Sequence, residues 1–366
     1  RIDPNNRAIS PYLAMALTYQ CSWSKLTGIT EQIIANTEYE LAQGLPVSAD
    51  PFGMLSLNTN HKLRAQVTES IAKSIQDRVR LVRQANPFTY AGRGPKLKIG
   101  LVSPDFRDHS AGHLFFGLCQ AYDRSRFEFH GYMLSVDGED ALTAKFRQQL
   151  VGFRNIGSLP LADAARLVNQ DGINVLVDLA GHTRGAWADL LAMRPAPVQV
   201  SAIGYGAALG GNLVDYLITD DAMWPEKDQQ YCSEKLVYLP HASLPGAPRE
   251  FSGRTFTRSQ AGLPDQGVVF ANFNGHYKFD PLSFGAWMRI LSKVPGSVLW
   301  VMEGSETSRA NLTKEAQARG IAADRLVFAE SVTVADHMSR LRLADVALDG
   351  TNLEGGATTL DALWAG

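Results

Sequence analysis

From Lys96 onward, short apolar segments alternate with amphipathic ones, and this alternation constrains the fold more than any other feature of the chain. Apolar runs rich in β-branched residues predict strands, whereas apolar residues three or four apart predict helices. Strands that alternate with helices are typical of a parallel sheet with helices on both faces. We expect strands at 97–102, 127–134, 173–179, 198–203, 214–219 and 235–239, with helices at 111–122, 139–150, 161–169 and 185–193.

A second series of the same kind begins at Gly267, after a stretch, 241–266, that is rich in proline and glycine. Its strands are expected at 268–272, 298–302, 326–328 and 343–348, and its helices at 281–293, 307–319 and 333–342. The predicted fold is therefore α/β with two Rossmann-like domains, 96–240 and 267–366, joined by 241–266. Ligands are expected at the carboxyl ends of the strands. No strand follows the last helix, so we expect the second domain to be incomplete.

The first 84 residues have a different pattern. Residues 10–19, 30–43 and 61–83 carry apolar side chains at helical spacing, so 1–84 is expected to be a helical segment. A helical repeat is a hypothesis here, because no two periods match. Residues 85–95 contain the proline and glycine residues of a linker.

Composition excludes several classes of protein. There are 35 Lys and Arg against 37 Asp and Glu, net charge −2, with no basic stripe, which argues against nucleic-acid binding. The three cysteines, Cys21, Cys119 and Cys232, are far apart and odd in number, which favours a reducing compartment without a disulfide framework. No apolar run reaches the ~18 residues of a membrane helix, and no signal peptide is apparent. We therefore expect a cytoplasmic protein without membrane association.

The end of the chain reads as a strand, a glycine-rich turn and a helix. A buried strand is expected at Leu343–Leu348, followed by Glu354-Gly-Gly-Ala-Thr-Thr359 and a helix that opens near Leu360. Free backbone N–H groups at such a turn, together with the helix dipole, make a site for an anion such as phosphate. An ordinary strand-to-helix turn is the alternative.

Seven segments between 97 and 366 occur in a shared order. They are Val102-Ser-Pro-Asp-Phe-Arg-Asp-His109, Gln170-Asp-Gly-Ile-Asn-Val-Leu-Val-Asp178, Arg194-Pro-Ala-Pro-Val-Gln199, Leu217-Ile-Thr-Asp220, Glu234-Lys-Leu-Val-Tyr-Leu-Pro-His241, Asn272-Phe-Asn-Gly-His-Tyr-Lys278-Phe-Asp-Pro281 and Leu343 to Gly366. Together they resemble the O-linked N-acetylglucosamine transferase family, glycosyltransferase family 41, in a bacterial-type member. The family also includes the plant SPINDLY proteins.

The resemblance implies a GT-B fold with a nucleotide sugar in the cleft between the two domains. It implies an inverting transfer of N-acetylglucosamine from UDP-N-acetylglucosamine to Ser or Thr hydroxyls of proteins, with no metal ion or other cofactor. Residues 1–84 would be the last helices of a tetratricopeptide-repeat region plus joining helices, and the chain would be truncated at its C-terminus.

Two residues are candidates for catalysis. His109 lies on a strand-to-helix loop, where an imidazole can act as general base because its unperturbed pKa is near neutrality. A structural histidine is the alternative, and the resemblance favours the base. Lys278 follows a predicted strand, where an ammonium can offset the charge of a departing diphosphate. A surface lysine is the alternative there, and the motif around Lys278 matches the family's essential lysine.

The resemblance assigns further residues to the donor. They are Tyr277, Val332, Val334, His337, Arg340, Gly356, Ala357, Thr358 and Asp361. Tyr277 could also belong to the core, His337 and Arg340 to a solvated helix face, and Asp361 to a helix start that favours acids. His113 is a second choice for the base, and His182 and Tyr205 border the acceptor side. No metal ligands are assigned.

The chain departs from the family pattern at several positions, which puts the donor in question. Gly204-Tyr-Gly-Ala-Ala208 replaces a proline-containing turn, Gly275 replaces a glutamine, Val334 replaces a lysine and Ala357 replaces a threonine. Two alternatives therefore remain: a protein O-fucosyltransferase that uses GDP-fucose, and a catalytically silent nucleotide-binding or scaffold relative.

Overall fold

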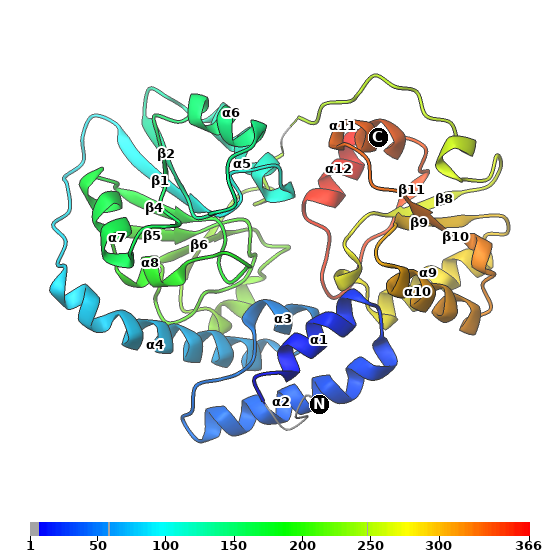
Figure 1. The fold of residues 1–366 in the computed structure, drawn as a ribbon, viewed down its shortest axis with the longest axis horizontal. Helices are drawn as coiled ribbons and strands as arrows, with labels where there is room; N and C mark the ends of the chain where they lie inside the picture. The colour runs from blue at the N-terminus through cyan, green and yellow to red at the C-terminus, as the bar shows by residue number, and fades with distance from the viewer. Residues whose placement is uncertain (1–6, 58, 247) are drawn as a thin grey trace. The chain divides into compact units, whose positions relative to one another are not determined.

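The computed structural model describes residues 7–57, 59–246 and 248–366 (Figure 1). The described chain forms two compact units. The first unit comprises residues 38–47 and 60–246, and the second comprises residues 7–37, 48–57, 59 and 248–366. Each contains one parallel sheet, as expected for two Rossmann-like domains of the GT-B type.

The first unit is built on a seven-stranded sheet in the order β3-β2-β1-β4-β5-β6-β7, and every strand pair is parallel. The strands are β1 Leu97–Ser103, β2 Phe127–Met133, β3 Gly152–Asn155, β4 Val175–Asp178, β5 Val198–Ser201, β6 Tyr216–Thr219 and β7 Lys235–Tyr238. The helices are α4 His61–Ala85, α5 Ser110–Ala121, α6 Ala141–Gln149, α7 Leu161–Gln170, α8 Ala188–Ala192 and the 3-10 turn η1 Glu226–Tyr231. Strand order reverses between β1 and β4, and such a switch point is where ligands bind in open α/β sheets.

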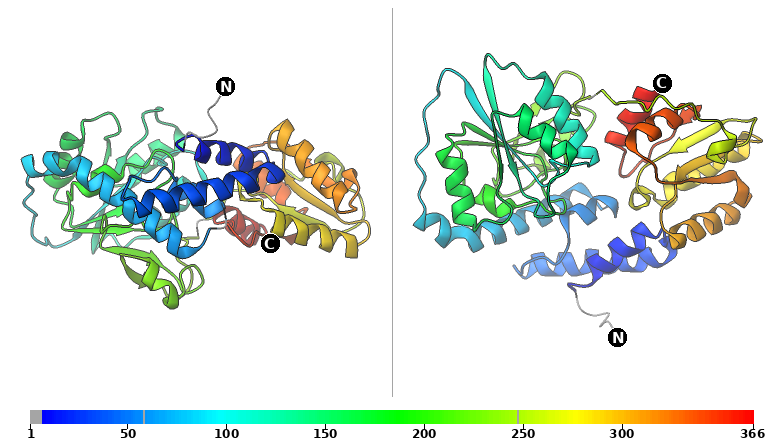
Figure 2. Two further views of the ribbon diagram at one scale, coloured as in Figure 1. Left: turned by 90° about the horizontal axis from the view of Figure 1, so that it is seen from below. Right: turned by 45° about the horizontal axis from the view of Figure 1, so that its top comes forward.

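Helix α4 belongs to the first unit and packs beside α8 (Figure 2). The Arg78 guanidinium pairs with the Asp189 carboxylate there, with Nε 2.8 Å from Oδ1. The linker expected at 85–95 contains neither helix nor strand between 87 and 94, and the Tyr90 hydroxyl donates to the Arg194 carbonyl of the same unit.

The second unit contains a four-stranded parallel sheet in the order β10-β9-β8-β11, which fits the expected incomplete domain. Its strands are β8 Val269–Asn272, β9 Val298–Met302, β10 Leu326–Ala329 and β11 Val346–Ala347. Its helices are α1 Ser10–Tyr19, α3 Pro51–Ser56, η2 Ser259–Ala261, η3 His276–Lys278, α9 Pro281–Lys293, α10 Glu306–Ala318, η4 Ala323–Arg325, α11 Val334–Leu341 and α12 Ala357–Ala365. Helix α2, Trp23–Ala42, begins in this unit.

Side-chain alternation along the strands divides the core of the second unit into two clusters. Phe270, Leu299 and Val301 pack with Trp23 and with α9 and α10 on one face, whereas Val269, Ala271 and Trp300 pack on the other. Helices α9 and α10 cover the first of these faces (Figure 1).

Three expectations about elements need correction. The strand predicted at 343–348 is short and exposed rather than buried, because β11 lies at the edge of the sheet and pairs with β8 alone among the described strands; Val346 is 44% exposed. Strand β3 was not predicted, since Gly152-Phe-Arg-Asn155 has no apolar run. Helix α3 was also missed; the Asp50 carboxylate caps it by accepting from the Gly53 N–H.

No helix in the described ranges is both long and apolar enough to cross a membrane.

Candidate active site

The second unit brings Lys278 to the switch point of its sheet. Lys278 lies in η3, just after β8, and the loop after β11 approaches it from the neighbouring strand. The Lys278 ammonium donates to the Glu354 carbonyl at 2.7 Å. Burial lowers the pKa of Lys278, and the nearby Asp349 and Glu354 carboxylates oppose that shift. The ammonium therefore lies at the carboxyl ends of two parallel strands, where ligands of such sheets bind.

The loop at 349–359 leads directly into the N-terminus of α12. Gly356, at the N-cap, provides no side-chain cap, so the N–H groups of the first turn are not occupied by a capping side chain. A Cβ atom at Gly355 would lie 2.6 Å from both the Thr358 and Thr359 hydroxyl oxygens, so only glycine fits this close approach. Free N–H groups and the helix dipole make this turn suited to an anion.

Contacts from neighbouring segments hold η3. The His276 ring is buried, with Nε2 2.8 Å from the Met302 carbonyl oxygen and Nδ1 2.9 Å from the Ser308 hydroxyl. Gly304 lies so close to this ring that a Cβ atom there would be 2.2 Å from the His276 Cε1 atom. The Tyr277 ring packs on Tyr19, with centroids 5.0 Å apart.

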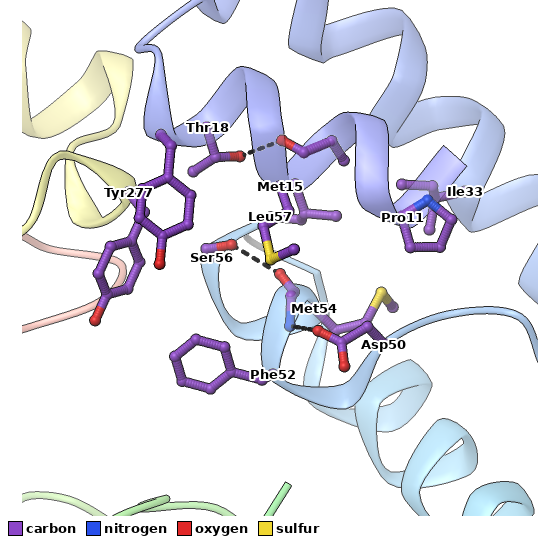
Figure 3. A pocket seen from close by; sticks show the side chains of 13 residues that line it. Pro11, Met15, Thr18, Ile33, Asp50, Phe52, Met54, Ser56, Leu57 and Tyr277 are labelled. Atoms are coloured by element: carbon purple, nitrogen blue, oxygen red, sulfur yellow. Dashed lines mark hydrogen bonds between the residues drawn. The ribbon is translucent and has the colours of Figure 1, made fainter. Parts of the chain in front are cut away.

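Tyr277 lines a pocket of the second unit together with residues of α1 and α3 (Figure 3). The Phe52 ring centroid lies 6.2 Å from that of Tyr277, and burial raises the pKa of the Tyr277 phenol to about 12. The ring is thus surrounded by the helical segment, as in the alternative that assigned it to the core. A contact of Tyr277 with the sugar stays a prediction.

Helix α11 carries His337 and Arg340. Arg340 is only 9% exposed, its guanidinium lies 5.7 Å from the centroid of Phe273 and 5.8 Å from that of Trp300, and its Nε has no hydrogen-bond partner among the described residues. Burial lowers the pKa of His337 to about 4, with a smaller contribution from the Arg340 charge. A buried guanidinium with an unused donor is costly unless an anion joins it. Arg340 therefore fits a donor-binding role better than a solvated helix face.

Asp361 of α12 has a partner that the sequence did not reveal. The Arg249 Nε donates to its carboxylate at 2.6 Å, and both side chains are largely buried. Arg249 lies in the stretch predicted as the inter-domain connection, and the stretch from 248 onward belongs to the second unit. One Asp361 oxygen is thus occupied by Arg249. Val332 and Val334, by contrast, are exposed.

In the first unit, His109 lies at the corresponding switch point, after β1. It is the N-cap of α5, and its Nδ1 accepts from the Ala111 N–H at 3.2 Å. The Asp105 Oδ2 lies 3.6 Å from the same nitrogen. A general base that acts through Nε2 needs the proton on Nδ1, which requires the ring to exchange Ala111 for Asp105. His113, one turn along α5, is paired through Nε2 with the Asp108 Oδ1 at 2.8 Å.

His182 and Tyr205 lie together on the loops after β4 and β5. Their ring centroids are 5.4 Å apart in an edge-to-face arrangement, and the His182 Nε2 lies 3.0 Å from the Leu209 carbonyl oxygen. The fully buried Asp178 ends β4 and accepts from the Gly181 N–H at 2.7 Å; burial raises its pKa to about 6. The structure thus brings both residues to the same edge of the sheet as His109.

The structure groups the predicted residues into two sets. Lys278, Gly356–Thr358, His337, Arg340 and Asp361 lie in the second unit, and His109, His113, His182 and Tyr205 lie in the first. A shared cleft for both sets stays a prediction. Within the described ranges, no group of three or more His, Cys, Asp or Glu side chains has the arrangement of a metal site.

Sequence reasoning missed Asp349 and Arg249. Asp349 was interpreted only as the first residue of a turn, although an aspartate before a glycine at a strand end is a signal for a loop-organising carboxylate. Arg249 gave no local signal, because its partner is 112 residues away.

Comparison with known proteins places these sites in context. The sequence profile of Glycosyl transferase family 41 matches residues 20–252 and 252–366. The probable UDP-N-acetylglucosamine–peptide N-acetylglucosaminyltransferase SEC of Arabidopsis thaliana is 29% identical over 94% of this chain and 37% of its own length. The probable UDP-N-acetylglucosamine–peptide N-acetylglucosaminyltransferase SPINDLY of the same plant is 31% identical over 74% of this chain and 30% of its own length.

A solved structure agrees with these relatives. A mutant of the O-GlcNAc transferase of Thermobaculum terrenum superimposes with a TM-score of 0.70 at 25% identity, over 96% of this chain and 68% of that chain. The chain spans 30% to 37% of the length of the two plant relatives. With a profile that matches both units, the chain belongs to glycosyltransferase family 41.

Proposed function

We propose that the protein is an inverting glycosyltransferase that moves N-acetylglucosamine from UDP-N-acetylglucosamine to Ser or Thr hydroxyls of proteins. The observation that carries the proposal is the anion site of the second unit. There, the Lys278 ammonium bonds to the glycine-rich loop ahead of the uncapped N-terminus of α12. The names of the relatives support the same donor and acceptor classes.

In the proposed reaction, the acceptor hydroxyl oxygen forms a bond to the anomeric carbon as the bond from that carbon to the diphosphate oxygen breaks. The hydroxyl proton passes to His109, and the electron pair of the broken bond leaves with UDP. Lys278 and the N–H groups of α12 stabilise the negative charge of the leaving diphosphate. Arg340 and Asp361 belong to the donor side.

Further parts of the proposal rest on the resemblance. Metal ions are not required, because Lys278 and the helix N-terminus offset the diphosphate charge; unchanged transfer in the presence of EDTA would support this point. Tetratricopeptide repeats upstream of the helical segment and a cytoplasmic location belong to the same proposal, as does the absence of nucleic-acid partners.

Lys278→Met tests the proposal. Transfer from UDP-N-acetylglucosamine to an acceptor peptide, followed by mass spectrometry, should fall at least about 10²–10³-fold, because a donor aimed at the leaving group is lost. Lys293→Met is the matched control, since Lys293 is an exposed lysine in the last turn of α9. Equal transfer by the two variants would remove Lys278 from the mechanism.

The donor is tested by heating the protein with UDP or with GDP. Protection by UDP supports the proposed donor, whereas protection by GDP alone favours the fucosyltransferase alternative. Protection by neither nucleotide, together with no sugar transfer, favours a catalytically silent relative.

A further inference from the structure

Asp349 is the centre of the loop that receives the Lys278 ammonium. Its Oδ1 accepts from the Gly350 N–H at 2.8 Å, from the Gly355 N–H at 2.9 Å and from the Asn274 amide at 3.1 Å. Its Oδ2 accepts from the Thr359 hydroxyl at 2.6 Å. One carboxylate thus connects the start of the loop, its glycine-rich part, the first turn of α12 and the segment after β8.

The backbone of Asp349 is held as well. The Trp287 indole N–H donates to the Asp349 carbonyl at 3.2 Å, and Trp287 is buried in the core of the second unit. The Asn274 Oδ1 accepts from the Thr358 hydroxyl, so a second bond connects the β8 side of the switch point to α12. The loop therefore has one defined conformation anchored on the sheet core.

The Asp349 carboxylate would repel a diphosphate at the neighbouring helix N-terminus, so its position needs a reason. Its four donors distribute its charge within the loop. Two of them, the Gly350 and Gly355 N–H groups, belong to backbone that otherwise has no regular partner after β11. Gly355 directly follows Glu354, whose carbonyl receives the Lys278 ammonium.

We propose that Asp349 is a positioning residue for donor turnover, which fixes the glycine-rich loop and through it the location and charge of the Lys278 ammonium. The inference rests on the proposed function. Asp349 does not touch the donor; it acts through Lys278 and the N–H groups of α12. Its negative charge also counteracts the burial that lowers the pKa of Lys278.

Asp349→Asn tests the proposal in the full protein, because it keeps the shape and removes the charge. An amide at 349 also presents one oxygen fewer, so the Thr359 hydroxyl loses its acceptor. We expect kcat/KM for the donor to fall about 10- to 100-fold, as for the loss of a charge-assisted hydrogen bond. The alkaline limb of the pH profile of kcat should move to lower pH, because Lys278 loses a stabilising carboxylate and deprotonates more readily.

Two further variants separate charge from structure. Asp345→Asn lies at the other end of β11, where its carboxylate accepts from the Val269 N–H and from Arg258, so it should lower stability without moving the alkaline limb. Thr359→Val removes one hydrogen bond and keeps the carboxylate, so it should lower kcat/KM less and leave the limb unchanged. Amide hydrogen exchange of residues 349–356 should quicken in Asp349→Asn and Thr359→Val but not in Asp345→Asn.

Several results would overturn the inference while leaving the proposed function intact. One is an Asp349→Asn enzyme with the wild-type alkaline limb and donor KM; another is an equal shift of the limb in Asp345→Asn. If Asp349→Asn does not fold, unchanged loop exchange in Thr359→Val would also overturn it. Failure of the proposed function itself has a different signature, namely a wild-type protein that neither binds UDP nor transfers the sugar.

Discussion

Burial gives two side chains of α11 opposite consequences. Arg340 stays charged because the pKa of a guanidinium is far above neutrality, so its burial among Phe273 and Trp300 leaves a cation in need of an anion. His337, one turn earlier, instead stays neutral, because burial and the Arg340 charge depress its pKa to about 4. A neutral imidazole beside a permanent cation suits a site that binds a phosphate through the cation alone.

The depressed pKa of His337 predicts a loss of stability in acid. The native state binds fewer protons than the unfolded state between the unfolded pKa of about 6.5 and the native value of about 4. Stability is therefore complete above pH 6.5 and falls as the pH drops toward 4, by up to about 3 kcal/mol. Urea unfolding of the wild type and of His337→Gln at pH 7.0 and 4.5 checks this. The variant should lose less stability on acidification, and equal losses would contradict the prediction.

Several site residues could be predicted from sequence because their roles are local. Lys278 and the glycine-rich loop each follow a strand at the switch point, and strand ends can be read from hydrophobic alternation. Thr333 was predicted as a helix cap from its spacing to Asp336, and its hydroxyl indeed accepts from the Asp336 N–H. Arg249 and Asp349 could not be recognised in the same way, because their roles depend on contacts that only the folded chain creates.

At the scale of elements, the turn between α1 and α2 holds the loop that carries Lys278. The Trp23 indole N–H donates to the Phe279 carbonyl at 3.2 Å, and the Cys21 thiol lies 3.6 Å from the His276 carbonyl oxygen. The Asn311 amide donates to the Gln20 carbonyl at 2.8 Å, which fixes the turn against α10. Hydrogen bonds from the helical segment thus reach the carbonyls on both sides of Tyr277 and Lys278.

Trp23→Phe should reduce sugar transfer by loosening this loop. The substitution keeps an aromatic ring in the core but removes the indole N–H, which leaves the Phe279 carbonyl without its donor and costs about 1–3 kcal/mol. We expect lower stability together with a lower kcat. Leu312→Val, in the same core cluster but away from this turn, is the control, with a stability loss of about 1 kcal/mol and an unchanged kcat. Equal kcat values in the two variants would show that the contact has no role in catalysis.

Element prediction succeeded where burial follows the local pattern. The bounds of α1, α9 and β9 agree with the expected 10–19, 281–293 and 298–302. It failed for β11, because an apolar run indicates a buried strand whether or not a neighbour covers it. It also could not foresee that α1 and α4, both expected within one helical segment, belong to different units, since that division depends on long-range packing.

At the scale of the whole molecule, two compact units with their own cores imply separable unfolding. The proposed UDP site lies within the second unit alone, so UDP binding should stabilise that unit selectively, by about 2.7 kcal/mol at a hundredfold excess over Kd. Differential scanning calorimetry should show one transition that rises by several degrees with UDP and another that does not move. The shift should be smaller in Lys278→Met. A UDP shift confined to the other transition would contradict the assignment of the donor site.

The close approach of Gly304 to the His276 ring has a consequence for how such sequences can diverge. A methyl group at position 304 has no room while an imidazole occupies 276, and 304 also has φ +63°, which disfavours other residues. Drift at either position is therefore coupled to the other. Among relatives aligned with this chain, a side chain at 304 should occur only with a smaller residue at 276, and an uncompensated change should inactivate an enzyme whose reacting groups are all intact.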